Sequence, residues 1–373
     1  MQVAKLMQVI EKLGVNTIGG VPDSTLQEFC NYLQAPECSL IHVPTADEGA
    51  AVGLAVGNYL GSGQPACVYM QNSGMGNVVN PITSLTSKEV YHIPVLYIIG
   101  WRGEPGKHDE PQHKFMGEIT TDLLELLNID YSVLTKDTTD AQLEEYYLKA
   151  KTAFAQKDQY AIIVKKGAFE KEIGTGYSNQ FKLCREDAIQ TIIEEIEEDD
   201  LLVTTTGKIS REAYEQSDIV KGRHNNLFLT VGGMGHSAMI AYGLAKQQPG
   251  RKIYCLDGDG ALLMHTGSML NIGSSPVENM VHICLNNESH ESVGGMRTCA
   301  VKTDFAKIAE IAGYMKVFTV YTKEDLIKYL QIAKGLSELV FIEVKVALGA
   351  RENLGRPKES AVENKEQFMK FIM

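Results

Sequence analysis

Short apolar runs alternate with stretches of helical periodicity along the whole chain. In the first half, six strand-like runs are separated by segments whose apolar positions recur at helical spacing. These runs span 15–20, 39–44, 66–71, 93–100, 130–135 and 160–166. Most of them are apolar at consecutive positions, which is typical of strands covered by helices on both faces. The alternation predicts a β/α unit with a buried, mostly parallel sheet.

The same pattern begins again after a polar, glycine-containing stretch at 167–180. Six further runs span 201–207, 227–233, 252–258, 281–287, 316–322 and 339–346. We therefore predict two tandem doubly wound α/β domains, each with a mostly parallel six-stranded sheet flanked by helices. The predicted domains are 1–168 and 183–373, joined by a linker at 169–182. A length of 373 residues agrees with two domains of ordinary size.

Two Gly-Met-Gly triplets occupy corresponding places in the two halves. Gly74-Met75-Gly76 and Gly233-Met234-Gly235 each follow a predicted strand and precede a predicted helix. Glycine lets the backbone approach a ligand, and the start of the next helix offers unpaired N–H groups to an anion. The alternative is that both triplets are ordinary tight turns of an α/β fold, which explains most single turns of this kind.

Composition and charge exclude several classes of protein. The chain is 44% hydrophobic and 22% charged, as in ordinary globular proteins. Its formal net charge of −12 argues against a general binder of nucleic acids or membrane surfaces. The seven cysteines include no C-x-x-C, and several lie in apolar runs, which indicates buried thiols in a reducing compartment. We find no secretory-signal pattern and no apolar run of membrane-spanning length, so we expect a cytoplasmic protein.

Acidic and glycine residues end the predicted strand at 252–258. Gly258-Asp259-Gly260 is followed by 25 residues and then by Asn286-Asn287, which end the next strand. Because neighbouring parallel strands end at the same edge of a sheet, these side chains are expected to lie close together. Carboxylate and amide oxygens suit Mg²⁺, and the N–H groups of Gly260 and Ala261 would hold phosphates. The spacing predicts a site for a diphosphate carried on Mg²⁺.

This pattern resembles the signature of the thiamin-diphosphate-dependent 2-oxoacid decarboxylases, which combines Gly-Asp-Gly, a gap of this size and Asn-Asn. The resemblance implies that Asp259, Asn287 and the backbone carbonyl of Ser289 bind Mg²⁺. It also implies a catalytic glutamate that bonds the aminopyrimidine ring of the cofactor, and Glu48 in the segment 44–63 takes that place. Met234 would hold the cofactor in its bent form. Judged locally, Glu48 is also explained as a solvated first-turn glutamate, and Met234 as a core or turn residue.

The length of the chain and several loops indicate one branch of this family. The segment 167–180 leaves no room for a middle domain, and the adjacent histidine pair of pyruvate decarboxylases is missing. Loops at 19–26, 99–117, 204–212, 285–298 and 350–357 resemble the short two-domain branch instead. The resemblance implies decarboxylation of 3-phosphonopyruvate to phosphonoacetaldehyde and CO₂, a step of phosphonate biosynthesis. Sulfopyruvate is the alternative substrate.

Three further alternatives remain for the function. An acetolactate-type carboligase and a non-catalytic binding paralogue of the family both fit the fold, although Glu48 and Asp259 are present. A plain nucleotide-binding protein is disfavoured, because no G-x-G-x-x-G follows the first predicted strand.

The expected substrate carries two acidic groups, so it needs a locally basic pocket in an acidic protein. The loop at 101–116 is rich in basic residues, and the forked guanidinium of arginine suits a phosphonate. The candidate substrate contacts are Ser24, Thr25, Arg102, Lys107, His113 and Arg297, and the further candidate catalytic groups are Asp23 and His290. The alternatives are a solvated mixed-charge loop, a turn-capping role for Asp23, an N-cap role for Ser24 and a structural histidine at 290.

The resemblance also implies which residues bind the cofactor and how the active site is assembled. The expected cofactor-binding residues are Glu48, Gly74, Met75, Gly233, Met234, Gly235, Gly258, Asp259, Gly260, Ala261 and Asn287. In this family the glutamate and the metal-binding aspartate usually reach one cofactor from different subunits. We therefore expect a homo-oligomer, a dimer or larger, whose partner is a small anionic 2-oxo acid rather than nucleic acid or membrane.

Overall fold

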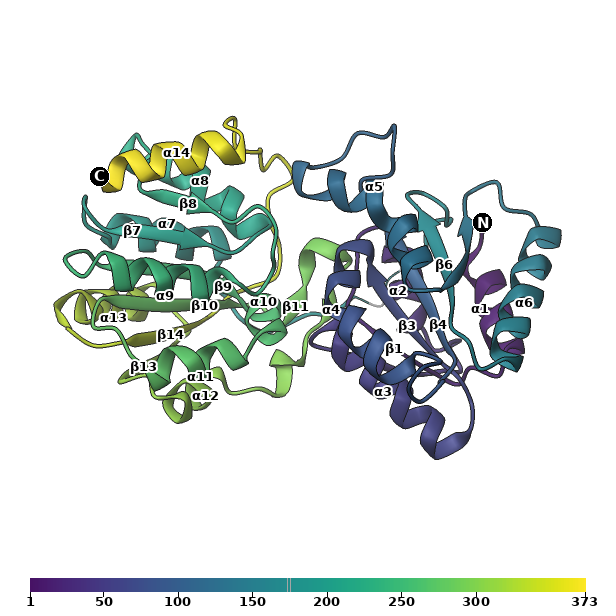
Figure 1. The fold of residues 1–373 in the computed structure, drawn as a ribbon. Coiled ribbons are helices and arrows are strands. Elements are labelled where there is room, and N and C mark those ends of the chain that lie inside the picture. The colour runs from purple at the N-terminus through teal and green to yellow at the C-terminus, as the bar shows by residue number, and fades with distance from the viewer. Residues whose placement is uncertain (173, 175) are drawn as a thin grey trace. The chain divides into compact units, whose positions relative to one another are not determined.

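The structure is a computed structural model that describes residues 1–172, 174 and 176–373 (Figure 1). These residues form two compact units: unit 1 is Met1–Gly176 with Val293–Met296, and unit 2 is Tyr177–Ser292 with Arg297–Met373. Each unit contains a six-stranded sheet, which confirms the predicted α/β architecture. The predicted linker at 169–182 includes positions 173 and 175, which lie outside the described residues.

Unit 1 contains a parallel sheet with the strand order β2-β1-β3-β4-β6-β5. Its strands are β1 (Thr17–Gly20), β2 (Ile41–Pro44), β3 (Ala66–Gln71), β4 (Val95–Trp101), β5 (Asp130–Leu134) and β6 (Tyr160–Lys165). Its helices are α1 (Val3–Lys12), α2 (Gln27–Leu33), α3 (Glu48–Ser62), α4 (Met75–Pro81), α5 (Pro111–Leu126) and α6 (Asp140–Ala155). Two short turns of helix, Asn72–Gly74 and Ile82–Thr86, flank α4.

The two faces of this sheet are buried by different helices. Alternate side chains of β4 show this, because Leu96 and Ile98 pack in the core formed with α1, α2 and α6. Tyr97 and Ile99 belong to the core formed with α3, α4 and α5. A strand buried on both faces must be apolar throughout, which is why its sequence shows no alternation.

Unit 2 repeats this architecture with the strand order β13-β14-β10-β9-β7-β8. Its sheet consists of β7 (Leu201–Thr204), β8 (Leu227–Leu229), β9 (Ile253–Gly258), β10 (Met280–Asn286), β13 (Lys316–Val320) and β14 (Val340–Lys345). The helices are α7 (Arg185–Glu195), α8 (Lys208–Lys221), α9 (Ser237–Gln247), α10 (Asp259–Met264), α11 (Gly267–Ser274), α12 (Phe305–Ala312), α13 (Lys323–Gly335) and α14 (Ala361–Ile372). The short elements are β11 (Ser289–His290), Glu291–Val293, β12 (Met296–Arg297) and Cys299–Lys302.

The core of unit 2 also has two layers. Residues of α7, α8 and α13 cover one face of the sheet, and residues of α9, α11, α12 and α14 cover the other. In Figure 1 the yellow C-terminal helix α14 lies beside β8, where the Asn364 side chain accepts from the backbone N–H of Leu229 at 3.0 Å. None of the helices in the described part of the chain is long and apolar enough to cross a membrane.

Several features differ from the sequence prediction, among them the strand predicted at 201–207, which ends at Thr204. The strand predicted at 227–233 ends at Leu229, because the residues after it form the turn that carries Gly233 at φ +59°. Val293–Met296 belongs to unit 1, where Met296 is buried in the core and lies 3.9 Å from the Tyr69 hydroxyl. Cys184 and Cys299 are exposed, so the expectation of buried thiols is wrong for these two positions.

Candidate active site

The motif residues of unit 2 gather at the carboxyl ends of two neighbouring strands. Asp259 follows β9 directly, and Asn287 follows β10, which is parallel to β9 with Leu285 opposite Gly258. Both side chains line a cavity of about 100 Å³. Its other lining residues include Met234, Gly258, Gly260, Ala261, Ser289 and His290. The structure therefore brings together the residues that the spacing predicted to be neighbours.

The Asp259 carboxyl group lines this cavity and is buried. Its Oδ2 atom accepts a hydrogen bond of 2.6 Å from the Thr298 hydroxyl. Burial raises the pKa of Asp259 to about 7, although the hydrogen bonds from Thr298 and the backbone lower it. A divalent cation would hold this carboxylate in its charged form, because the positive charge replaces the lost hydration. Asp259 therefore has the chemistry of a metal ligand.

Asn287 is oriented by a neighbouring glutamate. Its side-chain nitrogen donates to Glu291 Oε2 at 2.9 Å, and its Oδ1 atom accepts from the Ser289 backbone N–H at 3.0 Å. The side-chain oxygen of Asn287 is thereby fixed as the acceptor that a cation would bind. An aspartate, an amide oxygen and a nearby backbone carbonyl form a donor set that suits a hard divalent cation.

Two cationic side chains line the same cavity and share the Glu291 carboxylate. Arg185 donates to Glu291 at 2.7 Å and Lys208 at 3.0 Å. Arg185 also donates two bonds to the buried Glu212. Sequence patterns did not identify Arg185, Glu212 or Thr298, because each lies far along the chain from its partner. Glu291 lies only four residues after Asn287, but it belongs to no recognised motif. Arg185 and Lys208 bring charged N–H donors to the cavity, which suits a diphosphate.

Met234 and His290 both line the cavity near Gly260. Met234 stands between Gly233 and Gly235, both with positive φ, so it is presented on a tight turn. A Cβ atom at position 260 would lie 3.1 Å from the His290 ring and 3.9 Å from Met234. Burial lowers the pKa of His290 to about 4, so the imidazole is neutral at pH 7. His290 is thus placed to donate or accept a hydrogen bond without adding charge.

Glu48, in unit 1, is the first residue of α3 and is buried. Its Oε2 atom accepts a hydrogen bond of 2.7 Å from the side chain of Asn77. A Cβ atom at position 74 would collide with the Glu48 side chain, so glycine leaves room for the carboxyl group. Burial raises the pKa of Glu48 more than the bond from Asn77 lowers it. The alternative of a solvated first-turn glutamate is therefore wrong.

Asp23 lies just beyond β1 and is also buried. Its Oδ2 atom accepts from the Thr25 backbone N–H at 2.9 Å, so the turn-capping role is present. Its Oδ1 atom has no hydrogen-bond partner among the described residues, which leaves it available to a ligand. Burial raises the pKa of Asp23 to about 6, against smaller opposing effects from the Thr25 backbone and the charge of Arg102. A carboxyl group with this pKa is able to exchange a proton near neutral pH.

Arg102 is held rigidly beside Asp23 rather than lying in a solvated loop. Two of its guanidinium nitrogens donate to Asp109 at 2.8 and 2.5 Å, and a third donates to the Ser24 hydroxyl at 3.0 Å. Asp109 also accepts from the Gly103 backbone N–H at 2.8 Å. Ser24 is not an N-cap, because α2 begins at Gln27 with Leu26 as its N-cap. A fixed cation and a hydroxyl thus lie beside the carboxyl group of Asp23.

Of the remaining predicted substrate contacts, two have a buried polar atom and two are exposed. His113 Nδ1 has no hydrogen-bond partner in the described part of the chain, and its pKa is lowered by burial and then by the charge of Arg102. The Thr25 hydroxyl is likewise buried without such a partner. Lys107 is exposed on the loop of unit 1, and Arg297 is exposed in unit 2. His113 and Thr25 therefore belong to the partly buried surroundings of Arg102, whereas Lys107 does not.

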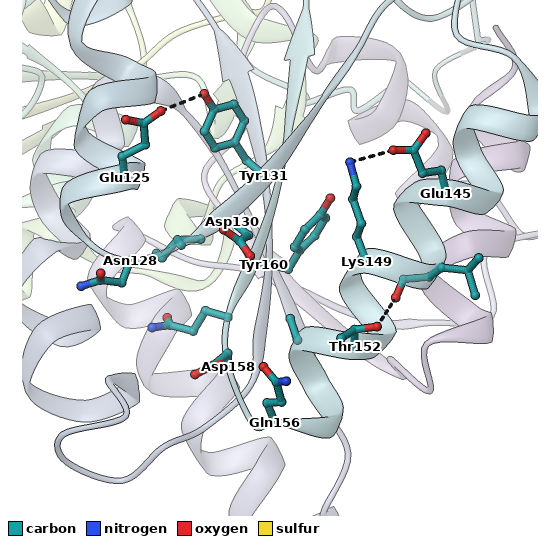
Figure 2. Close-up of a pocket in the computed structure, with 14 residues that line it drawn as sticks. Glu125, Asn128, Asp130, Tyr131, Glu145, Lys149, Thr152, Gln156, Asp158 and Tyr160 are labelled. Atoms are coloured by element: carbon teal, nitrogen blue, oxygen red, sulfur yellow. Dashed lines mark hydrogen bonds and ion pairs between the residues drawn. The ribbon is translucent and has the colours of Figure 1, made fainter.

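A larger groove of about 800 Å³ occurs on unit 1, but it lies at the wrong edge of the sheet (Figure 2). It is lined by residues around the amino ends of β5 and β6, such as Asp130 and Tyr160. Figure 2 shows that Lys149 is already paired with Glu145 there, at 2.7 Å. Ligands of doubly wound sheets bind at the carboxyl ends of the strands. The predicted site residues are all absent from this groove.

Comparison with known proteins identifies the family. Residues 1–126 match the family described as "Thiamine pyrophosphate enzyme, N-terminal TPP binding domain", and residues 206–344 match the corresponding C-terminal TPP binding domain. A phosphonopyruvate decarboxylase of Streptomyces viridochromogenes is 33% identical over 99% of this chain and 94% of its own length. The corresponding protein of Streptomyces hygroscopicus is 33% identical over 96% of this chain and 91% of its own length. A sulfopyruvate decarboxylase of Methanosarcina acetivorans is 26% identical over 91% of this chain and 90% of its own length.

The residues of unit 2 fit the cofactor of this family. The buried Asp259 carboxyl and the oriented Asn287 oxygen suit a divalent cation, and Arg185 and Lys208 suit the phosphates. The chain therefore belongs to the thiamin-diphosphate-dependent 2-oxoacid decarboxylase family, and it is a carboxy-lyase that uses thiamin diphosphate with a divalent cation.

Proposed function

We propose that the protein decarboxylates 3-phosphonopyruvate to phosphonoacetaldehyde and CO₂, with Mg²⁺ as its cation, in phosphonate biosynthesis. The observation that carries this proposal is the anchored Arg102 beside Asp23 and Ser24. The near full-length relatives that are phosphonopyruvate decarboxylases support it further. The reaction replaces the carbon–carbon bond to the carboxylate by a carbon–hydrogen bond, so it consumes one proton for each CO₂ released.

Arg102 and Ser24 are suited to the second acidic group of this substrate. Arg102 has one nitrogen directed at the Ser24 hydroxyl and two at Asp109, so its charge is held in one place before substrate binds. A phosphonate would accept hydrogen bonds from this nitrogen and from the Ser24 hydroxyl. Preorganised donors lose little entropy on binding, and an arginine–phosphonate contact is charge-assisted. Pyruvate has no group for this position.

When bound, thiamin diphosphate supplies the electron sink that makes loss of CO₂ possible. Glu48 would bond the aminopyrimidine ring, since burial raises its pKa and the bond from Asn77 fixes the position of its carboxyl group. Asp23 would hold the proton that the product takes up, because its pKa of about 6 allows exchange at neutral pH. Neutral His290 would add a hydrogen bond beside Gly260.

Residues of unit 2 would hold the other end of the cofactor. Asp259, Asn287 and the Ser289 carbonyl would bind the Mg²⁺, with Asn287 kept in orientation by Glu291. Gly258, Gly260 and Ala261 line the same cavity and would let the backbone approach the diphosphate, and Met234 would support the cofactor from the opposite side. Gly74 and Met75 would form the corresponding turn beside Glu48 in unit 1.

We further propose that the active enzyme is a cytoplasmic homo-oligomer whose sites lie between subunits. In such an assembly Glu48 of one chain and Asp259 of another would serve the same cofactor molecule. Symmetric dimers are the commonest oligomers of soluble proteins, and a two-fold axis would create two such sites.

The experiment is a comparison of kcat/KM for phosphonopyruvate, sulfopyruvate and pyruvate, each with and without thiamin diphosphate and Mg²⁺. We expect CO₂ release that requires both cofactors and a kcat/KM for phosphonopyruvate at least about tenfold above that for sulfopyruvate. Pyruvate should be the poorest substrate. Sulfopyruvate is the second candidate, because a sulfopyruvate decarboxylase also aligns over 91% of this chain. A higher kcat/KM for sulfopyruvate would contradict the proposal and identify sulfopyruvate as the preferred substrate.

A further inference from the structure

A second cluster of metal-binding side chains lies inside unit 2 and has no part in the proposed reaction. Cys255 and Asp257 are two residues apart on β9, so they face the same side of the sheet. His282 on β10 is directly opposite Cys255 in the strand register. All three side chains are fully buried. One ligand atom from each, the thiol, a carboxylate oxygen and an imidazole nitrogen, lies within 4.8 Å of the other two.

Two polar atoms of this cluster, Asp257 Oδ2 and His282 Nε2, have no hydrogen-bond partner in the described part of the chain. The hydroxyl of Ser237, which begins α9, is buried beside the Cys255 thiol. Almost all buried polar atoms in proteins are paired, since an unpaired one has lost its hydration without a replacement. Asp257 Oδ2 and His282 Nε2 are 3.5 Å apart, which is longer than an N–H···O hydrogen bond. The separation suits two ligands of one cation better than a direct bond.

The other atoms of these side chains are already held in place. His282 Nδ1 is bonded to the Tyr314 hydroxyl at 3.0 Å, and Asp257 Oδ1 accepts from the Gly258 backbone N–H at 2.9 Å. When Nδ1 of a histidine carries the hydrogen, Nε2 has a free lone pair that can bind a metal. Such supporting bonds from outside the ligand set are characteristic of protein metal sites.

The charges of the cluster balance those of a divalent ion. A thiolate and a carboxylate together carry two negative charges, so binding would leave no net charge in the core. Cysteine binds a metal ion as its thiolate, so binding at this cluster would be measurable as one proton released per ion.

We propose that Cys255, Asp257 and His282 bind a structural Zn²⁺ ion, with the Ser237 hydroxyl as the fourth donor. Cysteine, histidine and carboxylate ligands are the usual set for zinc, whereas Mg²⁺ prefers oxygen ligands alone. The ion would connect β9, β10 and the start of α9. It is distinct from the catalytic cation, whose ligand Asp259 lies two residues after Asp257.

The test measures bound metal and does not depend on the decarboxylation. The full chain is purified without chelators, dialysed against metal-free buffer and analysed by plasma mass spectrometry. We expect about one zinc per chain in the wild type and in Cys67→Ser, a buried cysteine of unit 1, and less than about 0.2 in Cys255→Ser and His282→Gln. Zinc below about 0.2 per wild-type chain, even after incubation with added Zn²⁺, would overturn the proposal.

Cobalt substitution distinguishes this site from zinc held elsewhere. Co²⁺ bound to a thiolate gives a strong charge-transfer band in the near ultraviolet. We expect this band in the wild type and in Cys67→Ser, and its loss in Cys255→Ser with the far-ultraviolet circular dichroism unchanged. Retention of both the band and the zinc in Cys255→Ser would contradict the proposed ligand set. Neither result affects the assignment of the substrate.

Discussion

The two units end their sheets with buried carboxyl groups, but the groups have different surroundings. In unit 1, Glu48 and Asp23 are bonded by an amide and by backbone N–H, and Asp23 Oδ1 has no hydrogen-bond partner among the described residues. In unit 2, Asp259 lies beside an oriented amide oxygen and near the cations Arg185 and Lys208. Burial raises the pKa of all three carboxyl groups.

This difference separates two uses of the same structural position. A buried carboxyl group whose pKa is raised toward neutrality, such as Asp23, is suited to proton transfer. The same group beside other oxygen donors is suited to a divalent cation, which replaces the proton. Each carboxyl group lies at the edge of its sheet, and the neighbouring side chains determine whether it is suited to proton transfer or to binding a cation. Variants of each carboxyl group should therefore fail in different ways.

The largest effect is expected for Asp259→Asn. Loss of the carboxylate removes the charge that we propose holds the cation, so we expect kcat/KM to fall by at least about 1,000-fold. Calorimetric Mg²⁺ binding in the presence of thiamin diphosphate should become undetectable. The exposed Asp199→Asn serves as the control and should behave as the wild type. An Asp259→Asn protein with wild-type Mg²⁺ affinity would contradict the assignment of the metal site.

Glu48→Gln should reduce activity while leaving the cofactor bound. The amide cannot exchange a proton with the pyrimidine ring, so we expect kcat to fall by about 100- to 1,000-fold. The dissociation constants of Mg²⁺ and thiamin diphosphate should change by less than about fivefold, because Glu48 is not a metal ligand in this account. A wild-type kcat in the Glu48→Gln enzyme would contradict the proposed catalytic role of Glu48.

Asp109→Asn should affect substrate binding rather than turnover. It removes the charge that fixes two nitrogens of Arg102. We expect KM for phosphonopyruvate to rise by about tenfold and kcat to change less than about threefold. The exposed Glu118→Gln on α5 is the matched control. An unchanged KM in Asp109→Asn would show that the anchoring of Arg102 is not needed.

Glu291 offers a smaller test of the proposed metal site, because its carboxylate accepts a hydrogen bond from the Asn287 side chain. Glu291→Ala should weaken Mg²⁺ binding by about tenfold, as other supporting residues of metal sites do. Glu291→Gln should be affected less, since its amide oxygen can still accept from Asn287 while the ion pairs with Arg185 and Lys208 are lost. Equal losses in both variants would point to the ion pairs instead.

The smallest predicted effect is a pH dependence of stability caused by Asp23. Its pKa is raised from 3.8 to about 6 on folding, so its contribution to stability is full below pH 3.8 and is lost as pH rises through 6. Asp23→Asn stays neutral at every pH. Its free energy of unfolding relative to the wild type should therefore increase by about 1 kcal/mol between pH 5 and pH 8. Urea unfolding at both pH values checks this, and a constant difference would contradict the raised pKa.

The sequence predicted the fold and the site residues at the strand ends better than the side chains that support those residues. Asp259 and Asn287 were predictable, because they follow neighbouring parallel strands with one helix-containing crossover between them. Thr298 and Arg185 were not, since their partners come from distant segments that no local pattern connects. The mixed charges of the loop around Arg102 also left open whether it was solvated or paired, and only the position of Asp109 resolves this.

The most direct test of the central claim, that these two kinds of carboxyl site complete one active centre from two chains, is a mixing experiment. Glu48→Gln and Asp259→Asn chains are co-refolded in equal amounts, and the rate of CO₂ release from phosphonopyruvate is measured. Half of the dimers formed at random are mixed, and each has one intact site, so we predict about one quarter of the wild-type activity. Activity no higher than that of the two separate variants, despite verified mixed dimers, would contradict the account.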